Sequence, residues 1–309
     1  MPRPRLLCGF CLAVVLSTLA GCGGSTHPTS APTPSLTVSS TRLVDGTRPP
    51  YITGLAVNPS DRSILLATNR GLWAIDAAGH HVQAIAARAR AEGHVGPYGE
   101  RVSSLAFLGP KELLGSGHPN GVRGGLPPFL GVIDSFDGGH SWTAIARAGM
   151  SDLHVLVVSG STVYGFDTVL GGVVASSDGG RTFAERFAPP GEALVLDMAI
   201  DPHETRHLLA STQTAIFSSP DGGNTWHKIS PGDEAHLAWM APGLYRADAD
   251  RSVQTSTDGG TTWKTVGELP RTPGKLVELA DGTLYSALID GSIAVSRDGG
   301  RSWKTLVAP

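Results

Sequence analysis

An eight-residue pattern, Ser-x-Asp-Gly-Gly-x-Ser/Thr-Trp/Phe, occurs five times in this chain and constrains the fold more than any other feature. The copies read SFDGGHSW, SSDGGRTF, SPDGGNTW, STDGGTTW and SRDGGRSW, and they carry Asp137, Asp178, Asp221, Asp258 and Asp298. Successive boxes are about 40 residues apart, which is the period of a propeller blade. We therefore expect a chain built from repeated units, since a single compact core of this size would be unusually large.

Each unit contains four short apolar runs. In the unit of the third box, LVLDMAI, HLLAST and AIFSS precede the box and WHKI follows it. Runs of this length, rich in β-branched and aromatic residues and bounded by Pro, Gly, Asp or Ser, predict strands. Residues 55–76 keep the same strand pattern without a box, as terminal repeats often do. These units together predict six blades, at 50–88, 101–146, 152–187, 194–230, 235–267 and 275–307.

The predicted fold class is therefore all-β, a six-bladed β-propeller of four-stranded blades that occupies residues 49–309. Closing the sheets into a ring leaves only short edges exposed. A parallel β-solenoid is the alternative, but its coils are usually shorter and have no hairpin turn at a fixed place.

The box itself is interpreted as a tight hairpin. Two glycines supply the positive φ angles that such a turn requires, and the Asp carboxylate can accept hydrogen bonds from the amides of its own turn. We expect the last residue of each box to be a large apolar plug between blades; these residues are Trp142, Phe183, Trp226, Trp263 and Trp303. Because an active site is built once, five copies favour a structural role for the box aspartates.

The N-terminus predicts export. Arg3 and Arg5 precede an apolar run from Leu6 to Leu19, so residues 1–21 have the form of a signal peptide. The following LAGC resembles the bacterial lipobox, which implies cleavage before Cys22 and lipidation of that cysteine. An ordinary signal peptide with an incidental cysteine is the alternative. The other two cysteines lie within the predicted signal peptide, so no disulfide or cysteine metal site is expected.

Residues 22–48 are rich in Ser, Thr and Pro and are predicted to be a tether. The expected location is the outer side of the bacterial cytoplasmic membrane or the cell envelope, where a lipid on Cys22 would anchor the chain. The formal net charge of −3 indicates no basic surface for nucleic acid.

A ligand site is expected on the face opposite the boxes. Two long segments, 87–101 and 115–131, are predicted to be neighbouring loops on that face, and long loops in compact repeat folds are often functional. Aligned inner strands place further polar residues at the mouth of the central channel. The candidate ligand-binding residues are Tyr51, Arg101, His118, Asp152, His154, Asp167, Glu234 and His236. Solvated strand ends are the alternative interpretation.

The same residues include possible metal ligands. His118, His154 and His236 form a possible metal cluster, but their spacing matches no ligand motif, and inner-strand side chains usually pack against the next blade. Helical HExxH motifs, GxSxG elbows and phosphate-binding loops are missing from the sequence. We therefore predict no metal and no cofactor.

The five boxes resemble the Asp-box, or BNR, repeat of sialidases, the sortilin luminal domain, photosystem II assembly propellers and bacterial lipoproteins labelled glycosylhydrolase or sialidase-like. This resemblance covers the chain from about residue 135 onward and implies boxes on hairpins away from the ligand face. A sialidase would also need three arginines for the substrate carboxylate, a Tyr–Glu pair, an Asp acid/base and an early [FY]RIP motif, which TRPPY at 47–51 does not match.

The prediction is thus a non-catalytic binding or assembly protein, without catalytic residues, that recognises a protein, glycan or small ligand on the loop face. A sialidase-like exo-glycoside hydrolase is the alternative.

Overall fold

The computed structural model describes residues 51–98, 101–119, 125–191, 194–232, 234–241 and 243–309. The predicted signal peptide, the tether and Cys22 lie outside the described residues. Within the described ranges, no helix is long and apolar enough to cross a membrane.

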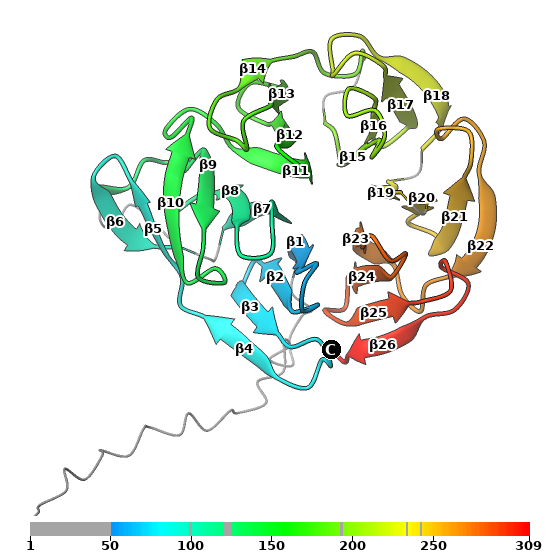
Figure 1. The fold of residues 1–309 in the computed structure, drawn as a ribbon, viewed down its shortest axis with the longest axis horizontal. Helices are drawn as coiled ribbons and strands as arrows, with labels where there is room; N and C mark the ends of the chain where they lie inside the picture. The colour runs from blue at the N-terminus through cyan, green and yellow to red at the C-terminus, as the bar shows by residue number, and fades with distance from the viewer. Residues whose placement is uncertain (1–50, 99–100, 120–124, 192–193, 233, 242) are drawn as a thin grey trace, which may run out of the picture. The chain divides into compact units, whose positions relative to one another are not determined.

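The described chain forms six sheets arranged in a ring around a central channel, so the predicted six-bladed β-propeller is confirmed (Figure 1). In each blade the four strands of the repeat follow one another in chain order from the channel outward. Blades one to three contain β1 (Ile52–Val57), β2 (Ile64–Thr68), β3 (Gly71–Ile75) and β4 (Val82–Ile85); β7 (Val102–Phe107), β8 (Leu113–Gly117), β9 (Val132–Ser135) and β10 (Ser141–Ala146); and β11 (Leu153–Ser159), β12 (Thr162–Asp167), β13 (Gly172–Ser176) and β14 (Ala184–Glu185).

Blades four to six follow the same order. They contain β15 (Asp197–Ile200), β16 (Leu208–Ser211), β17 (Ala215–Ser219) and β18 (His227–Pro231); β19 (His236–Met240), β20 (Gly243–Ala247), β21 (Ser252–Ser256) and β22 (Lys264–Glu268); and β23 (Pro273–Glu278), β24 (Leu284–Leu288), β25 (Ile293–Ser296) and β26 (Lys304–Val307).

Apolar packing between neighbouring blades holds the ring together. The buried apolar side chains among the described residues form six clusters, one at each blade interface. Strands of both neighbouring sheets contribute to each cluster because a strand points alternate side chains to its two faces. The first and last blades meet through a cluster that includes Leu66 and Tyr285, and an ion pair between Arg62 and Asp281 lies at the surface of the same junction. Side-chain packing therefore closes the ring.

The five boxes form hairpin turns between the third and fourth strands of blades two to six. Both glycines of every box have φ between 69° and 89°. In the third box, Thr225 donates from its backbone N–H to Asp221 at 2.8 Å and from its hydroxyl at 2.8 Å, while Gly223 N–H donates to the Ser219 hydroxyl at 2.8 Å. The other boxes repeat this pattern. These bonds agree with the turn chemistry expected from the sequence.

The box aromatics connect the turns to the packing between blades. Trp142 is fully buried in the cluster between blades one and two, and Trp226 is buried between blades three and four. Phe183, Trp263 and Trp303 are partly buried at the interfaces of their own blades. Each box thus forms a local turn and also places a large side chain at a blade interface.

The segment at 87–101 corrects a prediction. It was expected to be a loop, but it contains the strands β5 (Arg88–Ala91) and β6 (His94–Pro97), a hairpin that extends blade two beyond its outer strand. β5 pairs in parallel with β10. Ala87, Ala89 and Ala91 are buried while Arg88 and Arg90 are exposed, an alternation that is typical of a strand with one buried face.

Candidate functional site

Two neighbouring cavities lie along the inner strands of the propeller. One, of about 600 Å³, is lined mainly by residues at the starts of these strands; we call it the mouth cavity. The other, of about 370 Å³, is lined by the bodies and far ends of the same strands; we call it the inner cavity. Thr53, His154, Val155 and Lys275 line both, so the two cavities are adjacent along one channel.

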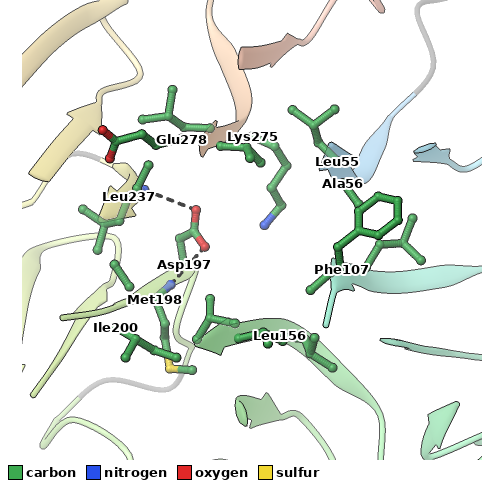
Figure 2. A pocket seen from close by; sticks show the side chains of 18 of the residues that line it. Leu55, Ala56, Phe107, Leu156, Asp197, Met198, Ile200, Leu237, Lys275 and Glu278 are labelled. Carbon is green, nitrogen blue, oxygen red and sulfur yellow. Dashed lines mark hydrogen bonds between the residues drawn. The ribbon is translucent and has the colours of Figure 1, made fainter. Parts of the chain in front are cut away.

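The inner cavity is mostly apolar but, besides His154, it is lined by three ionisable side chains. Figure 2 shows Lys275 pointing into it from blade six, which also carries Glu278, while Asp197 lies on blade four. Leu55, Phe107 and similar side chains form the remaining wall. Burying a charged group in such surroundings costs free energy unless the group is paired. The contacts of each group therefore determine its charge state.

Asp197 and Glu278 differ in the support they receive. Asp197 accepts N–H bonds from Met198 at 2.9 Å and Leu237 at 3.3 Å. Burial acts to raise the pKa of Asp197, but the charge of Lys275 and the contact with His236 outweigh it and lower that pKa. Glu278 accepts one bond, from Met240 N–H at 3.0 Å, and its other carboxyl oxygen is buried without a partner. Burial therefore raises the pKa of Glu278 to about 8.

Sequence reasoning missed these three residues as channel residues. A signal was present, because Asp197 and Glu278 each interrupt an otherwise apolar strand, in VLDMAI and KLVEL. Lys275 was missed because strand alignment placed Gly274 and Leu276 toward the channel. In the structure Lys275 lines both cavities, while Gly274 lines the mouth cavity and Leu276 the inner cavity.

The mouth cavity brings together most of the predicted ligand residues. Six of them line it: Tyr51, Arg101, His118, His154, Glu234 and His236. All six blades contribute to its wall, and the exposed apolar side chains of Tyr51, Leu194 and Ile289 lie among the polar ones. Tyr51 is 72% exposed. The residues described at 87–98 do not line the cavity, so the first long segment contributes to it through Arg101 and the second through His118.

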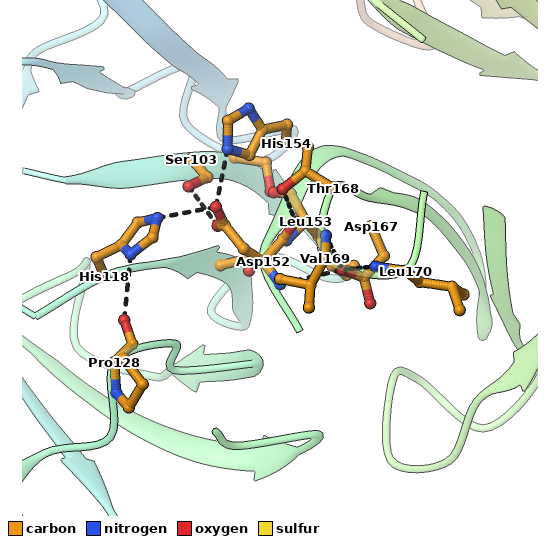
Figure 3. A network of polar contacts seen from close by, with 12 residues as sticks. Ser103, His118, Pro128, Asp152, Leu153, His154, Asp167, Thr168, Val169 and Leu170 are labelled. Atoms are coloured by element: carbon orange, nitrogen blue, oxygen red, sulfur yellow. Dashed lines mark hydrogen bonds and ion pairs between the residues drawn. The ribbon is translucent and has the colours of Figure 1, made fainter. Parts of the chain in front are cut away.

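Asp152 lies at the centre of a polar network in the wall of the mouth cavity (Figure 3). Its Oδ2 atom is 2.8 Å from His118 Nε2 and 2.8 Å from His154 Nε2, and its Oδ1 accepts a bond from the Ser103 hydroxyl at 2.6 Å. Burial acts to raise the pKa of Asp152, but hydrogen bonds from His118, His154 and Ser103 outweigh it and hold that pKa well below its usual range.

The local backbone and its neighbours position His118. Gly117 before it has φ of 153°, and a Cβ there would lie 2.2 Å from the Arg101 carbonyl, so only glycine fits this close approach. The ring Nδ1 of His118 is 3.1 Å from the carbonyl oxygen of Pro128, and Phe129 contacts the ring edge-on. The hydrogen bond with Asp152 raises the pKa of His118.

Asp167 is not within reach of a ligand in the mouth cavity. Its side chain is fully buried, and its Oδ1 accepts N–H bonds from Asp152, Val169 and Leu170. Arg147 approaches its Oδ2 at 3.5 Å. The structure therefore corrects the predicted ligand role: Asp167 supports the backbone that carries Asp152.

His236 and Glu234 lie elsewhere on the mouth cavity, on blade five. His236 Nδ1 is 3.3 Å from Asp197, so this histidine is paired apart from His118 and His154. Glu234 is exposed and has φ of 48°, in the left-handed region that non-glycine residues rarely adopt. Such backbone strain is often concentrated at functional sites.

Comparisons with known proteins find similarity to xyloglucanases over part of this chain. No family model matches this chain. The chain is 28% identical over 183 residues to the xyloglucanase Xgh74A of Acetivibrio thermocellus, a match that covers 46% of this chain and 22% of that protein. This chain therefore matches only about a fifth of the length of that curated relative.

Solved structures agree at the level of the fold. A GH74 xyloglucanase from Xanthomonas campestris aligns with a TM-score of 0.50 and 16% identity, covering 85% of this chain and 46% of that chain. An ancestral GH74 enzyme aligns with a TM-score of 0.53 and 11% identity, covering 83% of this chain and 38% of that chain. The chain is thus a propeller similar to those of glycoside hydrolases, and at this identity the likeness concerns the fold alone.

Proposed function

We propose that this chain is an exported, lipid-anchored propeller that binds a glycan in its mouth cavity without hydrolysing it. The observation that carries the proposal is the composition of this cavity. It combines an exposed aromatic ring, Tyr51, with hydrogen-bonding groups that converge from several blades, including Arg101 and Glu234. Ligand sites typically combine apolar surface with a few convergent polar groups, and an amphipathic ring such as tyrosine suits one face of a sugar.

The similarity to xyloglucanases supports a glycan as the ligand class. Xyloglucan, a β-glucan with side-chain sugars, is the first polysaccharide to test. Its neutral sugars present hydroxyl groups, which both the carboxylate of Glu234 and the guanidinium of Arg101 can engage by hydrogen bonds.

The carboxylates of the mouth cavity favour binding over hydrolysis. Hydrolysis by the usual route needs an acid and a second carboxylate on either side of the scissile bond. Both oxygens of Asp152 already face donors from Ser103, His118 and His154. Glu234 is then the one carboxylate that lines this cavity within the described part of the chain. Arg101 is likewise its one arginine there, which disfavours a sialidase-like arginine triad.

Glycoside hydrolysis is the second candidate, and one observation favours it. Glu278 in the inner cavity has its pKa raised to about 8, so it holds a proton at neutral pH as a general acid must. Asp197 lines the same cavity with a lowered pKa and would be the ionised partner. Two carboxyl groups whose environments separate their pKa values are a common sign of an acid and base pair.

We also propose a location for the chain and a type for its repeats. The predicted signal peptide at 1–21 and lipidation of Cys22 would place the propeller at the outer side of the cytoplasmic membrane or in the cell envelope, held by the tether at 22–48. We assign the five boxes to the Asp-box repeat, with structural aspartates. Incorporation of a labelled fatty acid into the wild type and its loss in Cys22→Ser would test the anchor.

Calorimetric titration of the purified protein with xyloglucan oligosaccharides tests the binding proposal. We expect Tyr51→Ala and Arg101→Ala each to weaken binding by about tenfold or more, since a contact worth about 1.4 kcal/mol changes affinity tenfold. Phe136→Ala is the matched control, because Phe136 is a similarly exposed aromatic, 61% accessible, in a box turn. Equal effects of Tyr51→Ala and Phe136→Ala, or no binding to any member of a glycan panel, would contradict the proposal.

A reducing-sugar assay on the same oligosaccharides separates the two candidates. Binding without turnover supports the first. Turnover that is abolished in Glu278→Gln and Asp197→Asn but retained in Glu234→Gln would establish the second and reject the non-catalytic proposal.

A further inference from the structure

We propose that His118, Asp152 and His154 bind a divalent transition-metal ion, with Zn²⁺ as the best match, in the wall of the mouth cavity. This inference goes beyond glycan binding and does not depend on it. The sequence predicted no metal because the spacing of these residues matches no motif; the propeller brings them together from blades two and three.

The three donor atoms already converge. Their ligating atoms all lie within 4.8 Å of one another. Two imidazoles and one carboxylate form a donor set that Zn²⁺ uses with a further open position. Zinc bonds of about 2.0–2.2 Å separate neighbouring ligand atoms by about 3.4 Å in a tetrahedral site. The two N···O separations of 2.8 Å would therefore open by about half an ångström.

The contacts of His118 indicate what can lie between its Nε2 atom and the Asp152 carboxylate. The carbonyl oxygen of Pro128 can only accept, so His118 Nδ1 must donate to it. The Nε2 atom of His118 then faces an Asp152 oxygen at 2.8 Å, a contact that is attractive when either a proton or a metal cation lies between the two atoms. Donation of the second ring N–H to a backbone carbonyl is also the usual arrangement of a metal-bound histidine.

Further contacts hold the donors in place. Ser103 donates to the second oxygen of Asp152 at 2.6 Å, and Asp167 accepts the backbone N–H of Asp152 at 3.3 Å. The Phe129 ring packs against His118. Outer contacts of this kind orient metal ligands, and their loss typically lowers affinity. The Asp152 side chain is only 4% exposed, while that of His154 is 50% exposed and free to adjust.

The cluster also leaves room for a ligand on the metal. His118 and His154 line the mouth cavity, so the remaining coordination positions of the ion would face that cavity. A water molecule or a ligand oxygen would occupy them. His236 lines the same cavity but pairs with Asp197 at 3.3 Å, outside this three-residue group. It is therefore a matched control histidine.

Titration of the full chain with ZnCl₂, after chelator treatment and without a histidine tag, tests the proposal. Calorimetry and elemental analysis of the dialysed protein should give one zinc per chain. We expect His154→Ala to weaken Zn²⁺ binding by about 100-fold or more, Ser103→Ala by about tenfold, and His236→Ala to leave it unchanged. Because His154 is half exposed, its variant should fold, and thermal melting of the apoprotein checks this.

Co²⁺ substitution provides a second readout that folding alone does not change. The wild type should give visible absorption bands of four- or five-coordinate Co²⁺, and His154→Ala should lose them while His236→Ala keeps them. The proposal is overturned if Zn²⁺ and Co²⁺ fail to bind in the micromolar range, if Ca²⁺ or Mg²⁺ bind in preference to them, or if His154→Ala binds Zn²⁺ as well as the wild type. In the first case only a proton would lie between His118 and Asp152.

Discussion

The box aspartate Asp298 and the network aspartate Asp152 each accept three hydrogen bonds, but from very different distances along the chain. Asp298 receives its bonds from Ser296 and Ser302, all within its own turn. Asp152 receives bonds from Ser103 and His118, which lie 49 and 34 residues away, in addition to His154. Hydrogen bonds from Ser302 lower the pKa of Asp298 to about 2, and the pKa of Asp152 is lowered in a similar way.

This contrast separates turn-forming carboxylates from site-forming ones. A box aspartate would find its partners in any turn with the same eight residues, so the pattern can be repeated. Asp152 finds its partners only after blades two and three have packed together. Similar charge states therefore arise from local structure in one case and from tertiary structure in the other.

A Trp142→Ala variant tests whether a box stabilises the fold only through its own turn or also through packing between blades. Of the predictions made here, it should have the largest effect on the free energy of unfolding. We expect Trp142→Ala to lower the free energy of unfolding by about 3–5 kcal/mol, because the ring is fully buried between blades one and two. Denaturant unfolding measures this loss. The partly exposed Trp303 is the control, and its alanine variant should cost less. Equal costs would indicate that the boxes act by turn formation alone.

Glu278 differs from the box aspartates and Asp152 because one of its carboxyl oxygens is buried without a hydrogen-bond donor. Folding raises its pKa from the ordinary value of 4.5 to about 8, so the folded protein keeps a proton that the unfolded chain loses. Its contribution to stability is therefore full below about pH 4.5 and is lost as pH rises toward 8. Glu278→Gln should remove this loss, on the order of 3 kcal/mol.

Unfolding measured at several pH values between 4.5 and 8.5 checks this prediction. The exposed Glu204→Gln variant is the control and should follow the wild type. A wild-type stability that rises over this interval relative to Glu278→Gln would show that Glu278 is ionised in the folded protein.

Pairs of serine and histidine variants test directly whether hydrogen-bond donors act independently of one another. The expected changes in the free energy of unfolding are the smallest of the three. Ser219→Ala and Ser296→Ala, in separate boxes, should each cost about 1 kcal/mol and add to within about 0.5 kcal/mol. Ser103→Ala and His118→Ala share Asp152, so their effects should deviate from additivity by about 0.5 kcal/mol or more. Double-mutant cycles with chelator present measure both. Additivity in the second pair would mean that the Asp152 network is not cooperative.

Much of the mouth cavity could be predicted from strand register. The alignment of inner-strand starts placed Tyr51, Arg101, Glu234 and His236 correctly on its wall. This succeeded because side chains alternate with a period of two and the blades repeat. The same logic placed Gly274 and Leu276 correctly but missed Lys275, which lies between them and lines both cavities.

The hairpin of β5 and β6 was overlooked for a different reason. It is an insertion that occurs in one unit only, so the repeat contains no template for it. The alternation of alanine and arginine at 87–91 was nevertheless a local signal of a half-buried strand.

The sequence alone determined the number of blades, the position of each box turn and the face that carries the mouth cavity. These features depend on patterns within about 40 residues, where glycine φ angles, strand alternation and nearby donors act locally. Only the tertiary structure decided that Asp152 lies between His118 and His154, that Asp167 is buried behind it, and that burial raises the pKa of Glu278. Those outcomes depend on distances and desolvation between blades, which arise only when the ring closes.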